Sequence, residues 1–204
     1  MKALCKTQPS AGAELVDRDR PQAGPNEIVV EVRAAAICGT DKHLWQYDAW
    51  AAGRLKLPRV FGHECSGDVI EVGSEVTGVS VGDFVSLETH VPCGHCRLCR
   101  TDRQHICQNL KILGVDIDGC FAEHVKVPAL CAWKNPGDMK PEVAAIQEPF
   151  GNAVYCCETG DVRAKSVAII GDGPIACFAT AIAKAWGARE VVVVGMNAAR
   201  LGIA

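Results

Sequence analysis

Four cysteines lie close together in the middle of the chain, at a spacing that suits a metal ion. Cys93, Cys96, Cys99 and Cys107 form a C-x2-C-x2-C-x7-C run within PCGHCRLCRTDRQHIC. Four thiolates at such gaps can surround a tetrahedral Zn²⁺ and leave no position open for a substrate. Two alternatives are weaker, since the run lacks the C-P ending of a ferredoxin-type cluster and the absence of a secretion signal disfavours disulfides. We therefore predict a closed, structural zinc site.

A looser set of metal ligands precedes this run and consists of Cys38, His63 and Glu64. A thiolate, an imidazole and a carboxylate can hold a catalytic Zn²⁺ with one position left for a substrate. The spacing alone leaves other readings open, because a single buried cysteine usually packs as a small apolar side chain. Neighbouring side chains of an extended segment point to opposite faces, so His63 and Glu64 can share an ion only where the chain bends. We expect His63 to be a firm zinc ligand and Glu64 a loose or exchanging one. Glu148 could supply or replace a carboxylate.

A glycine-rich turn follows at residues 171–176, with the sequence GDGPIA. It fits G-x-G-x-x-G/A and stands between a buried-type strand at 166–170 and a helical segment that ends near Gly187. In that setting the backbone can approach a pyrophosphate at the helix N-terminus. The acidic residue expected after the next strand, which binds ribose hydroxyls, is missing because position 195 is Gly. Arg200 and Asn197 are left to face the ribose or a 2′-phosphate, so NAD and NADP both stay open.

The elements around these groups fall into two parts. An alternating strand at Ile28–Arg33 and two short strands bounded by glycines, Gly67–Gly73 and Gly82–Leu87, are typical of a partly open barrel. Residues 89–110 have little apolar periodicity and form a lobe that a metal would hold together. Helical spacing after Pro141 is interrupted at Pro149, which favours an extended Glu148. From residue 166 on, two continuous apolar strands with a helix between them indicate a βαβ unit and a parallel sheet.

These patterns predict a mixed α/β protein of two domains. Residues 1–150 form the barrel-like, zinc-binding catalytic domain, and residues 151–204 form the first, incomplete part of a Rossmann-type nucleotide domain. Two parallel strands alone leave large apolar faces in water. We therefore expect the chain to be a fragment of a longer enzyme, with an incomplete cofactor site.

Composition narrows the classes of function. The chain has 204 residues, of which 49% are hydrophobic and 22% charged, as in ordinary globular proteins. A net charge of −3 gives no basic field for nucleic acid, and no apolar run is long enough to span a bilayer. Twelve cysteines without a secretion signal indicate reduced thiols. We expect a cytoplasmic protein that acts on a small molecule and has neither a nucleic-acid nor a membrane partner.

With these residues assembled, the chain resembles the zinc-dependent medium-chain alcohol dehydrogenases along its whole length. The resemblance is carried by the stretches ICGTDKHLW, GHECSGDVIEVG, GDFVSLETHVPCGHCRLC, QEPFGNAV and GDGPIA. It implies a GroES-like fold for the first domain and one catalytic and one structural zinc ion. Position by position, it assigns the catalytic zinc to Cys38, His63 and Glu64 and the structural zinc to Cys93, Cys96, Cys99 and Cys107. It makes Thr40 and His43 a proton relay, Glu148 a carboxylate beside the metal, and Ile175 and Arg200 nucleotide contacts beside Gly171, Gly173 and Pro174 of the turn.

The activity that the resemblance implies is oxidation of a secondary alcohol to a ketone with hydride transfer to NAD or NADP. L-threonine, giving 2-amino-3-oxobutanoate, is the first substrate to expect. A polyol or 2,3-butanediol dehydrogenase shares much of the framework, and an inactive zinc-binding fragment is the alternative from another class. Thr40 and His43 are three residues apart and would share one face of a helix, where they can pass a proton to solvent; Thr40 can also cap that helix. A homo-oligomer, a tetramer as in the family, is expected of the full-length enzyme.

Overall fold

The computed structural model describes residues 1–204 and divides them into two compact units, Met1–Ile146 and Gln147–Ala204. Each unit has its own sheets and its own buried core. Helix α4 (Gln147–Gly160) runs across position 150, where the sequence analysis ended the first domain. None of the helices has the length and apolar character needed to cross a bilayer.

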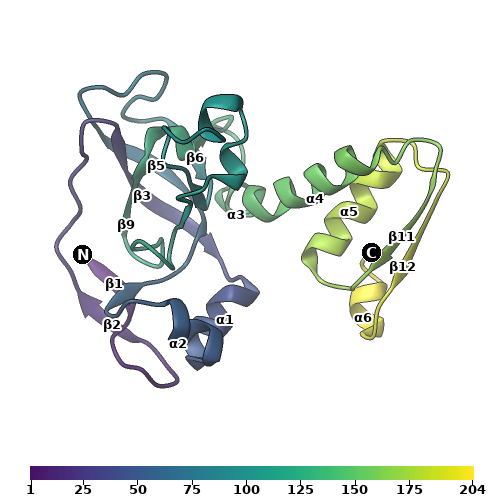
Figure 1. Ribbon diagram of the computed structural model, residues 1–204, viewed down its shortest axis with the longest axis horizontal. Helices are drawn as coiled ribbons and strands as arrows, with labels where there is room; N and C mark the ends of the chain where they lie inside the picture. The colour runs from purple at the N-terminus through teal and green to yellow at the C-terminus, as the bar shows by residue number, and fades with distance from the viewer. The chain divides into compact units, whose positions relative to one another are not determined.

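The first unit is built on open antiparallel sheets (Figure 1). A five-stranded sheet has the order β10-β6-β5-β3-β9, and a three-stranded sheet has the order β2-β1-β4. The larger sheet contains β3 (Glu27–Ala36), β5 (Glu64–Val72), β6 (Phe84–Leu87), β9 (His124–Pro128) and β10 (Ala132–Lys134). The smaller one contains β1 (Lys2–Lys6), β2 (Glu14–Asp17) and β4 (Arg59–Val60), while β7 (His90–Val91) pairs with β8 (Lys111–Ile112). The mixed α/β class and the three strands of the sequence analysis are confirmed, and no barrel closes.

The core of this unit lies against the larger sheet. Its fully buried side chains come mainly from β3, β5, β6 and β9, and include Ile28, Val30, Val69, Val85, Leu87 and Val125. Strand β5 passes very close to β3 at Gly67, where an added Cβ would lie 2.0 Å from the carbonyl oxygen of Glu31. A glycine is therefore required at this position. The long β3–β5 pairing also fixes the positions of the segments that follow β3 and precede β5.

Two short helices follow β3, namely α1 (Gly39–Gln46) and α2 (Ala49–Arg54). Cys38 is the N-cap of α1, so the expectation that Thr40 caps this helix is wrong. The helix begins two residues earlier because Asp41 closes back onto the amide of Cys38. Leu44 on α1 packs with Ala51 of α2 in a small separate cluster.

A buried lysine ties the end of α1 to the first strand. The Lys6 side chain is fully buried, and its Nζ donates to the carbonyl oxygens of Ser10, Gly12 (2.7 Å) and Trp45 (2.9 Å). An ammonium group has three protons, and here each has a carbonyl acceptor. The contact to Trp45 anchors the last turn of α1.

The second unit is a single βαβ unit with a helix in front of it. Strand β11 (Ser166–Ile170), helix α5 (Pro174–Ala185) and strand β12 (Glu190–Val194) are followed by the short α6 (Ala198–Leu201). The strands pair in parallel from Ser166↔Glu190 to Ile170↔Val194, which confirms the predicted βαβ unit. Its core contains Ala153, Cys157, Val162, Ile182 and Ala183.

The break expected at Pro149 does not occur there. Glu148 and Pro149 both lie in the first turn of α4, and the helical run is interrupted earlier, at Ile146, after α3 (Pro141–Ala145). The first turn of a helix has free amide groups, so the missing N–H of a proline costs nothing there. The proline therefore marks the start of α4.

Candidate zinc centres and nucleotide turn

The pairing of β3 with β5 brings the first set of ligands together. In this antiparallel pair Ala36 lies opposite Glu64, so the segment just after β3 and the segment just before β5 meet at one end of the sheet. Cys38 follows β3 by two residues, and His63 directly precedes β5. Cys38 and His63, which are 25 positions apart in the chain, are thus neighbours because the register of the long strand pair places them at the same end of the sheet.

The ligand atoms of Cys38, His63 and Glu64 all lie within 4.8 Å of one another. His63 and Glu64 are about 95% buried, with 5% and 6% of their surfaces exposed. The chain bends just before them, at Gly62, whose φ of +90° and close approach to Phe121 exclude any side chain. This bend meets the condition under which neighbouring residues can face the same point.

A fourth residue, Asp41, holds two of these ligands. Its Oδ2 accepts the backbone N–H of Cys38 at 2.8 Å, and its Oδ1 lies 3.6 Å from Nδ1 of His63. Both Oδ1 and Nδ1 are buried without a hydrogen-bond partner. A histidine that binds a metal commonly points its other ring nitrogen at a carboxylate. With Nδ1 turned towards Asp41, Nε2 of His63 is left for an ion.

Burial disfavours the charged forms of the acidic side chains in this group. It raises the pKa of the Cys38 thiol, of the Glu64 carboxyl and of the Asp41 carboxyl, because each charged form loses hydration. The imidazole of His63 acts in the opposite direction and lowers the pKa of both carboxyls. A divalent cation would reverse the effect of burial, since it favours the deprotonated ligands. The donor set therefore fits a zinc ion.

The two residues assigned to a proton relay both lie on α1. Thr40 is in its first turn and His43 one turn later, as their spacing predicted. Nδ1 of His43 lies 2.5 Å from Oδ2 of Asp48, and its ring meets Trp50 edge to face at 6.0 Å. Asp48 also caps α2 by accepting the N–H of Ala51. His43 is half exposed, so its ring connects the helix to solvent.

The four cysteines of the second set also converge. Their sulfur atoms all lie within 4.8 Å of one another, with separations of 3.5 Å for Cys96–Cys99, 3.8 Å for Cys96–Cys107 and 4.0 Å for Cys93–Cys99. A tetrahedron of ~2.3 Å Zn–S bonds has sulfur–sulfur edges of about 3.8 Å. The geometry therefore fits a closed zinc site.

Backbone amides surround these sulfurs. Cys107 accepts N–H groups from Cys93 and Asn109, both at 3.3 Å. The backbone N–H of His95 is the main reason why the pKa of Cys93 falls to about 5. Burial, followed by contacts with neighbouring sulfurs, raises the pKa of Cys99 to about 12. Without a cation the sulfurs cannot all ionise together, which again fits a metal as the missing component.

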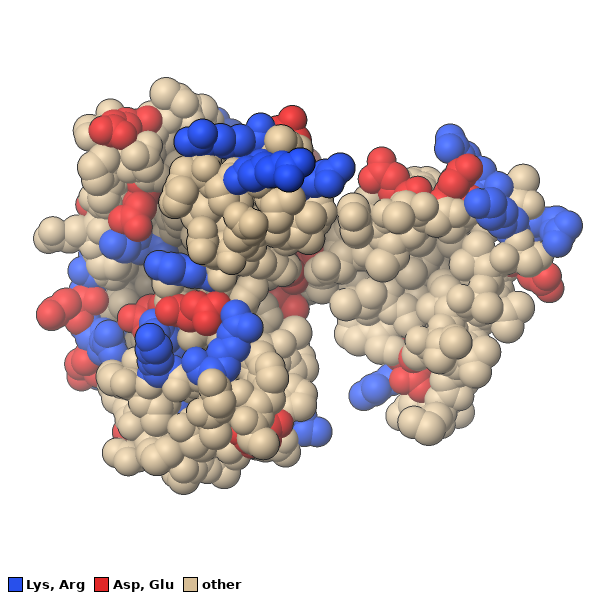
Figure 2. All heavy atoms as spheres, in the orientation of Figure 1, with Lys and Arg blue, Asp and Glu red and all other residues tan.

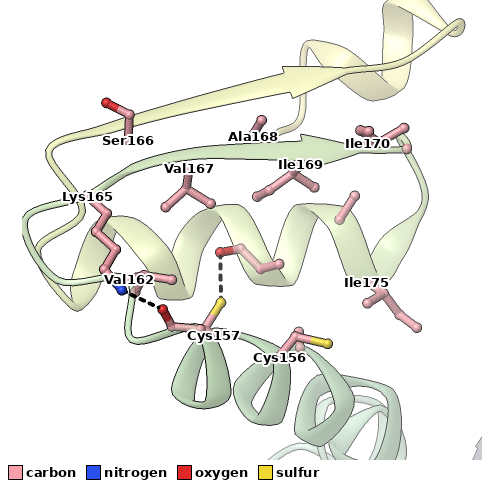
Figure 3. A pocket seen from close by; sticks show the side chains of 15 residues that line it. Cys156, Cys157, Val162, Lys165, Ser166, Val167, Ala168, Ile169, Ile170 and Ile175 are labelled. Carbon is pink, nitrogen blue, oxygen red and sulfur yellow. Dashed lines mark hydrogen bonds between the residues drawn. The ribbon is translucent and has the colours of Figure 1, made fainter.

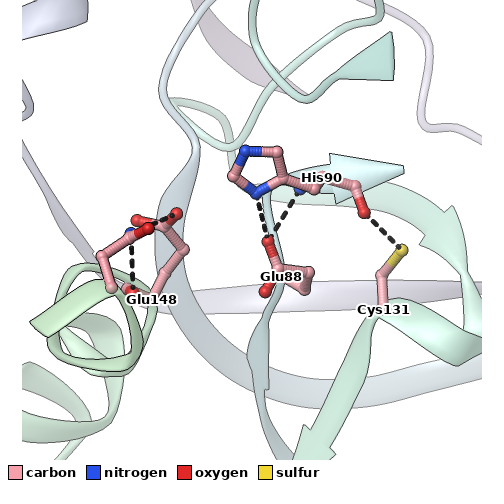
Figure 4. Close-up of polar contacts among 5 residues, drawn as sticks. Glu88, His90, Cys131 and Glu148 are labelled. Carbon is pink, nitrogen blue, oxygen red and sulfur yellow. Dashed lines mark hydrogen bonds and ion pairs between the residues drawn. The ribbon is translucent and has the colours of Figure 1, made fainter. Parts of the chain in front are cut away.

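Polar side chains also lie near the start of the lobe. Glu88 accepts from the backbone N–H of His90 at 2.9 Å and lies 2.7 Å from its Nδ1 (Figure 4). The thiol of Cys131 donates to the carbonyl oxygen of His90 at 3.9 Å. Glu148 belongs to the other unit, where its carboxylate accepts from Nδ2 of Asn152 at 3.2 Å. Its role beside a metal stays a prediction.

The glycine-rich turn links β11 to α5 as predicted. Gly171 has a φ of +126°, and an added Cβ at Gly171 or Gly173 would meet nothing within 4 Å, so the surface over the turn is open. Gly173 is the N-cap of α5 and Pro174 occupies its first turn. Free amides at a helix N-terminus beside an open backbone suit a phosphate group. Arg200 lies on α6, at the carboxyl end of the neighbouring strand.

A cavity of about 670 Å³ lies beside this turn, along the edge of β11 that has no neighbouring strand (Figure 3). Side chains of α4, β11 and α5 line it, among them Cys156, Val167, Ile169 and Ile175. Of the seven cysteines outside the two ligand sets, Cys156 is exposed and Cys177 half-buried, while Cys5, Cys65, Cys120, Cys131 and Cys157 are buried.

Sequence reasoning missed three acidic residues at these sites. Asp41 contacts two ligands of the first set, Asp48 contacts His43, and Asp172 contacts the segment after β12. Asp41 stands three residues after Cys38, the spacing of a capping box, and this signal was available. Asp48 and Asp172 carry no such signal, because their partners depend on how neighbouring elements pack.

Comparison with known proteins agrees with this geometry. Residues 24–137 match the sequence profile of the alcohol dehydrogenase GroES-like domain. The chain is 50% identical over 193 residues to an L-threonine 3-dehydrogenase from Thermococcus kodakarensis, an alignment that covers 95% of this chain and 55% of that protein. The chain therefore spans little more than half the length of such relatives.

Solved structures of dehydrogenases have the same fold. A zinc-binding dehydrogenase from Sinorhizobium meliloti bound to NADP superposes with a TM-score of 0.88 at 30% identity, covering 98% of this chain and 57% of that one. A short chain alcohol dehydrogenase from E. coli CFT073 in complex with NADH superposes with a TM-score of 0.90 at 31% identity, covering 99% and 58%. From its GroES-like domain and these relatives, the chain belongs to the zinc-dependent medium-chain alcohol dehydrogenase family.

Proposed function

We propose that this chain carries the zinc site of an enzyme that oxidises a secondary alcohol to a ketone, with L-threonine as the first substrate and a nicotinamide nucleotide as the hydride acceptor. The observation that carries the proposal is the convergence of a half-buried thiol with a buried imidazole and a buried carboxylate at the start of the helix that holds Thr40 and His43. The relatives with about 50% identity are L-threonine 3-dehydrogenases, which supports threonine as the substrate.

In this proposal each residue has a distinct task. Cys38, His63 and Glu64 hold the catalytic zinc, and Asp41 orients the first two through its two oxygens. A zinc ion in this position is a Lewis acid that lowers the pKa of an alcohol hydroxyl. Thr40 and His43 move the released proton along α1, and Asp48 keeps the His43 ring in place. The four cysteines of the lobe hold the second zinc ion, which has a structural role.

The nucleotide is held by the second unit. Gly171, Gly173 and Pro174 form the open turn over which a pyrophosphate fits, and Ile175 and Arg200 flank it. The nicotinamide group of such a nucleotide accepts the hydride. Glu148 supplies a further carboxylate beside the catalytic zinc.

The experiment that tests the zinc assignment is metal analysis of the purified chain and two single variants. We expect two zinc ions per chain, falling to one in Cys38→Ala, because the lobe site does not use Cys38. The matched control is Cys5→Ala, which removes a buried cysteine that lies outside both sets and should keep both ions. Equal zinc content in the two variants would contradict the assignment.

Substrate choice is tested by measuring NAD- and NADP-dependent oxidation of L-threonine, sorbitol and 2,3-butanediol. We expect threonine to give the highest kcat/KM, and a higher value for sorbitol or butanediol would replace it as substrate.

Assembly and location are further proposals. The family implies a tetramer, which sedimentation analysis can detect, and twelve free cysteines suit the reducing cytoplasm.

A further inference from the structure

The glycine-rich turn contains a carboxylate whose position the sequence pattern did not reveal. Oδ2 of Asp172 accepts the backbone N–H groups of Met196 and Asn197, both at 2.7 Å. Its Oδ1 lies 3.5 Å from Nη1 of Arg200. The Asp172 side chain is only 14% exposed, whereas that of Arg200 is 61% exposed. A side chain that starts in the turn after β11 therefore ends against the segment after β12.

Asp172 and the residue at position 195 compete for one space. Gly195 follows β12 directly, and a Cβ built on it would lie 2.6 Å from Cβ and 2.7 Å from Oδ2 of Asp172. Atoms cannot approach this closely, so a side chain at position 195 and the observed position of Asp172 exclude each other. The carboxylate that is missing from the end of β12 is thus supplied from the turn after the neighbouring strand.

In βαβ nucleotide folds, an acidic residue about 20 positions after the turn accepts hydrogen bonds from the adenosine ribose, whereas an arginine there accommodates a 2′-phosphate. A carboxylate and an arginine are both present here, but the guanidinium of Arg200 already faces the carboxylate of Asp172. A 2′-phosphate entering this corner would meet that carboxylate and would have to draw Arg200 away from it.

We infer that Asp172 is the residue that selects the cofactor, accepting hydrogen bonds from the ribose hydroxyls of NAD and rejecting the 2′-phosphate of NADP. The inference rests on the proposed function, because it assumes that the turn binds a nicotinamide nucleotide. It removes the ambiguity left by Gly195, whose lack of a carboxylate would by itself favour NADP. The two backbone amides, above all that of Asn197, also lower the pKa of Asp172 and keep it charged.

The test is calorimetric titration of the 204-residue chain with NAD and NADP, and with their adenosine portions, 5′-AMP and adenosine 2′,5′-bisphosphate. We expect NAD to bind about tenfold or more tightly than NADP, the size of effect given by one hydrogen bond to a charged group. Asp172→Ala should abolish or invert this ratio, because Arg200 is then free for the phosphate. Asp172→Gly combined with Gly195→Asp should restore it, because the carboxylate returns from the other strand and no Cβ remains at position 172 to meet the new side chain.

Two further variants separate an effect on nucleotide binding from an effect on folding. Asp172→Asn keeps an oxygen for the amides of Met196 and Asn197 but removes the charge, so it should lower the NAD:NADP ratio while circular dichroism stays unchanged. Asp161→Asn, which neutralises an exposed aspartate of the same unit, should keep the ratio. Tighter binding of NADP by the unsubstituted chain, or a ratio that Asp172→Asn and Asp172→Ala leave unchanged, overturns the inference and leaves the proposed function standing. Binding of neither nucleotide overturns the inference together with the nucleotide-binding part of the proposed function.

Discussion

Lys6 shows how one buried charge can position a site from the opposite end of a helix. Its Nζ contacts three carbonyl oxygens, one of them on Trp45 at the end of α1, and Cys38 caps the start of the same helix. The cost of burying an ammonium group is offset here because every proton has an acceptor. Lys6 thus connects the loop after β1 to the helix that carries Thr40 and His43.

We expect Lys6→Met, which has a similar shape, to lower the free energy of unfolding by about 2–4 kcal/mol, because it leaves buried carbonyl oxygens without a donor. Chemical unfolding followed by circular dichroism measures this. The matched control is Lys2→Met, an exposed lysine at the start of the same strand, which should remain close to the unsubstituted protein. Equal effects of the two substitutions would show that the three carbonyl contacts of Lys6 contribute nothing.

At the scale of elements, the cysteine lobe has almost no core of its own. Its cluster consists of three buried cysteines with partly buried Cys93, Leu98 and Leu110, and its only regular elements are the short 3-10 helices Cys99–Thr101 and Gln104–Ile106. A segment with so little apolar burial depends on its metal for order. The larger sheet, by contrast, has a continuous apolar core.

We therefore expect zinc removal by a chelator to increase amide hydrogen exchange in residues 93–110 by orders of magnitude, while β3 and β5 keep their protection. Cys99→Ala should have the same effect even with zinc in excess. Cys131→Ala, which removes a buried thiol outside the lobe, should not. Unchanged exchange in the lobe after complete loss of metal would mean that the polypeptide alone maintains its structure.

The elements also show what sequence patterns can and cannot predict. Strands β3, β5, β11 and β12 were predictable because their apolar residues follow a local period, and the cysteine run was predictable because its ligands are close in sequence. The start of α4 was not, because a proline fits the first turn of a helix as well as it breaks one. Asp172 was missed for another reason: its contacts with Met196 and Asn197 exist only once two parallel strands are side by side.

At the scale of the whole molecule, the second unit exposes one face of its sheet. Helix α5 covers the face that carries Val167 and Val191, while Ile170, Val192 and Val194 on the other face are 90%, 49% and 54% exposed. Figure 2 shows few charged side chains across the middle of this unit, whereas acidic and basic side chains alternate over much of the first. A contiguous apolar face of this kind favours association with other apolar surfaces.

We expect the 204-residue chain to bind an apolar dye such as ANS and to associate as its concentration rises, both through this face. Ile170→Thr combined with Val192→Thr should reduce dye binding and association, because threonine keeps the β-branched shape that suits a strand while adding a hydroxyl. Leu15→Thr is the matched control, since Leu15 is 69% exposed but lies on β2 of the first unit. Sedimentation velocity at several concentrations, with ANS fluorescence on the same samples, measures both effects. If Leu15→Thr lowers association as much as the double substitution does, the exposed sheet face is not its cause, and general surface hydrophobicity is the better explanation.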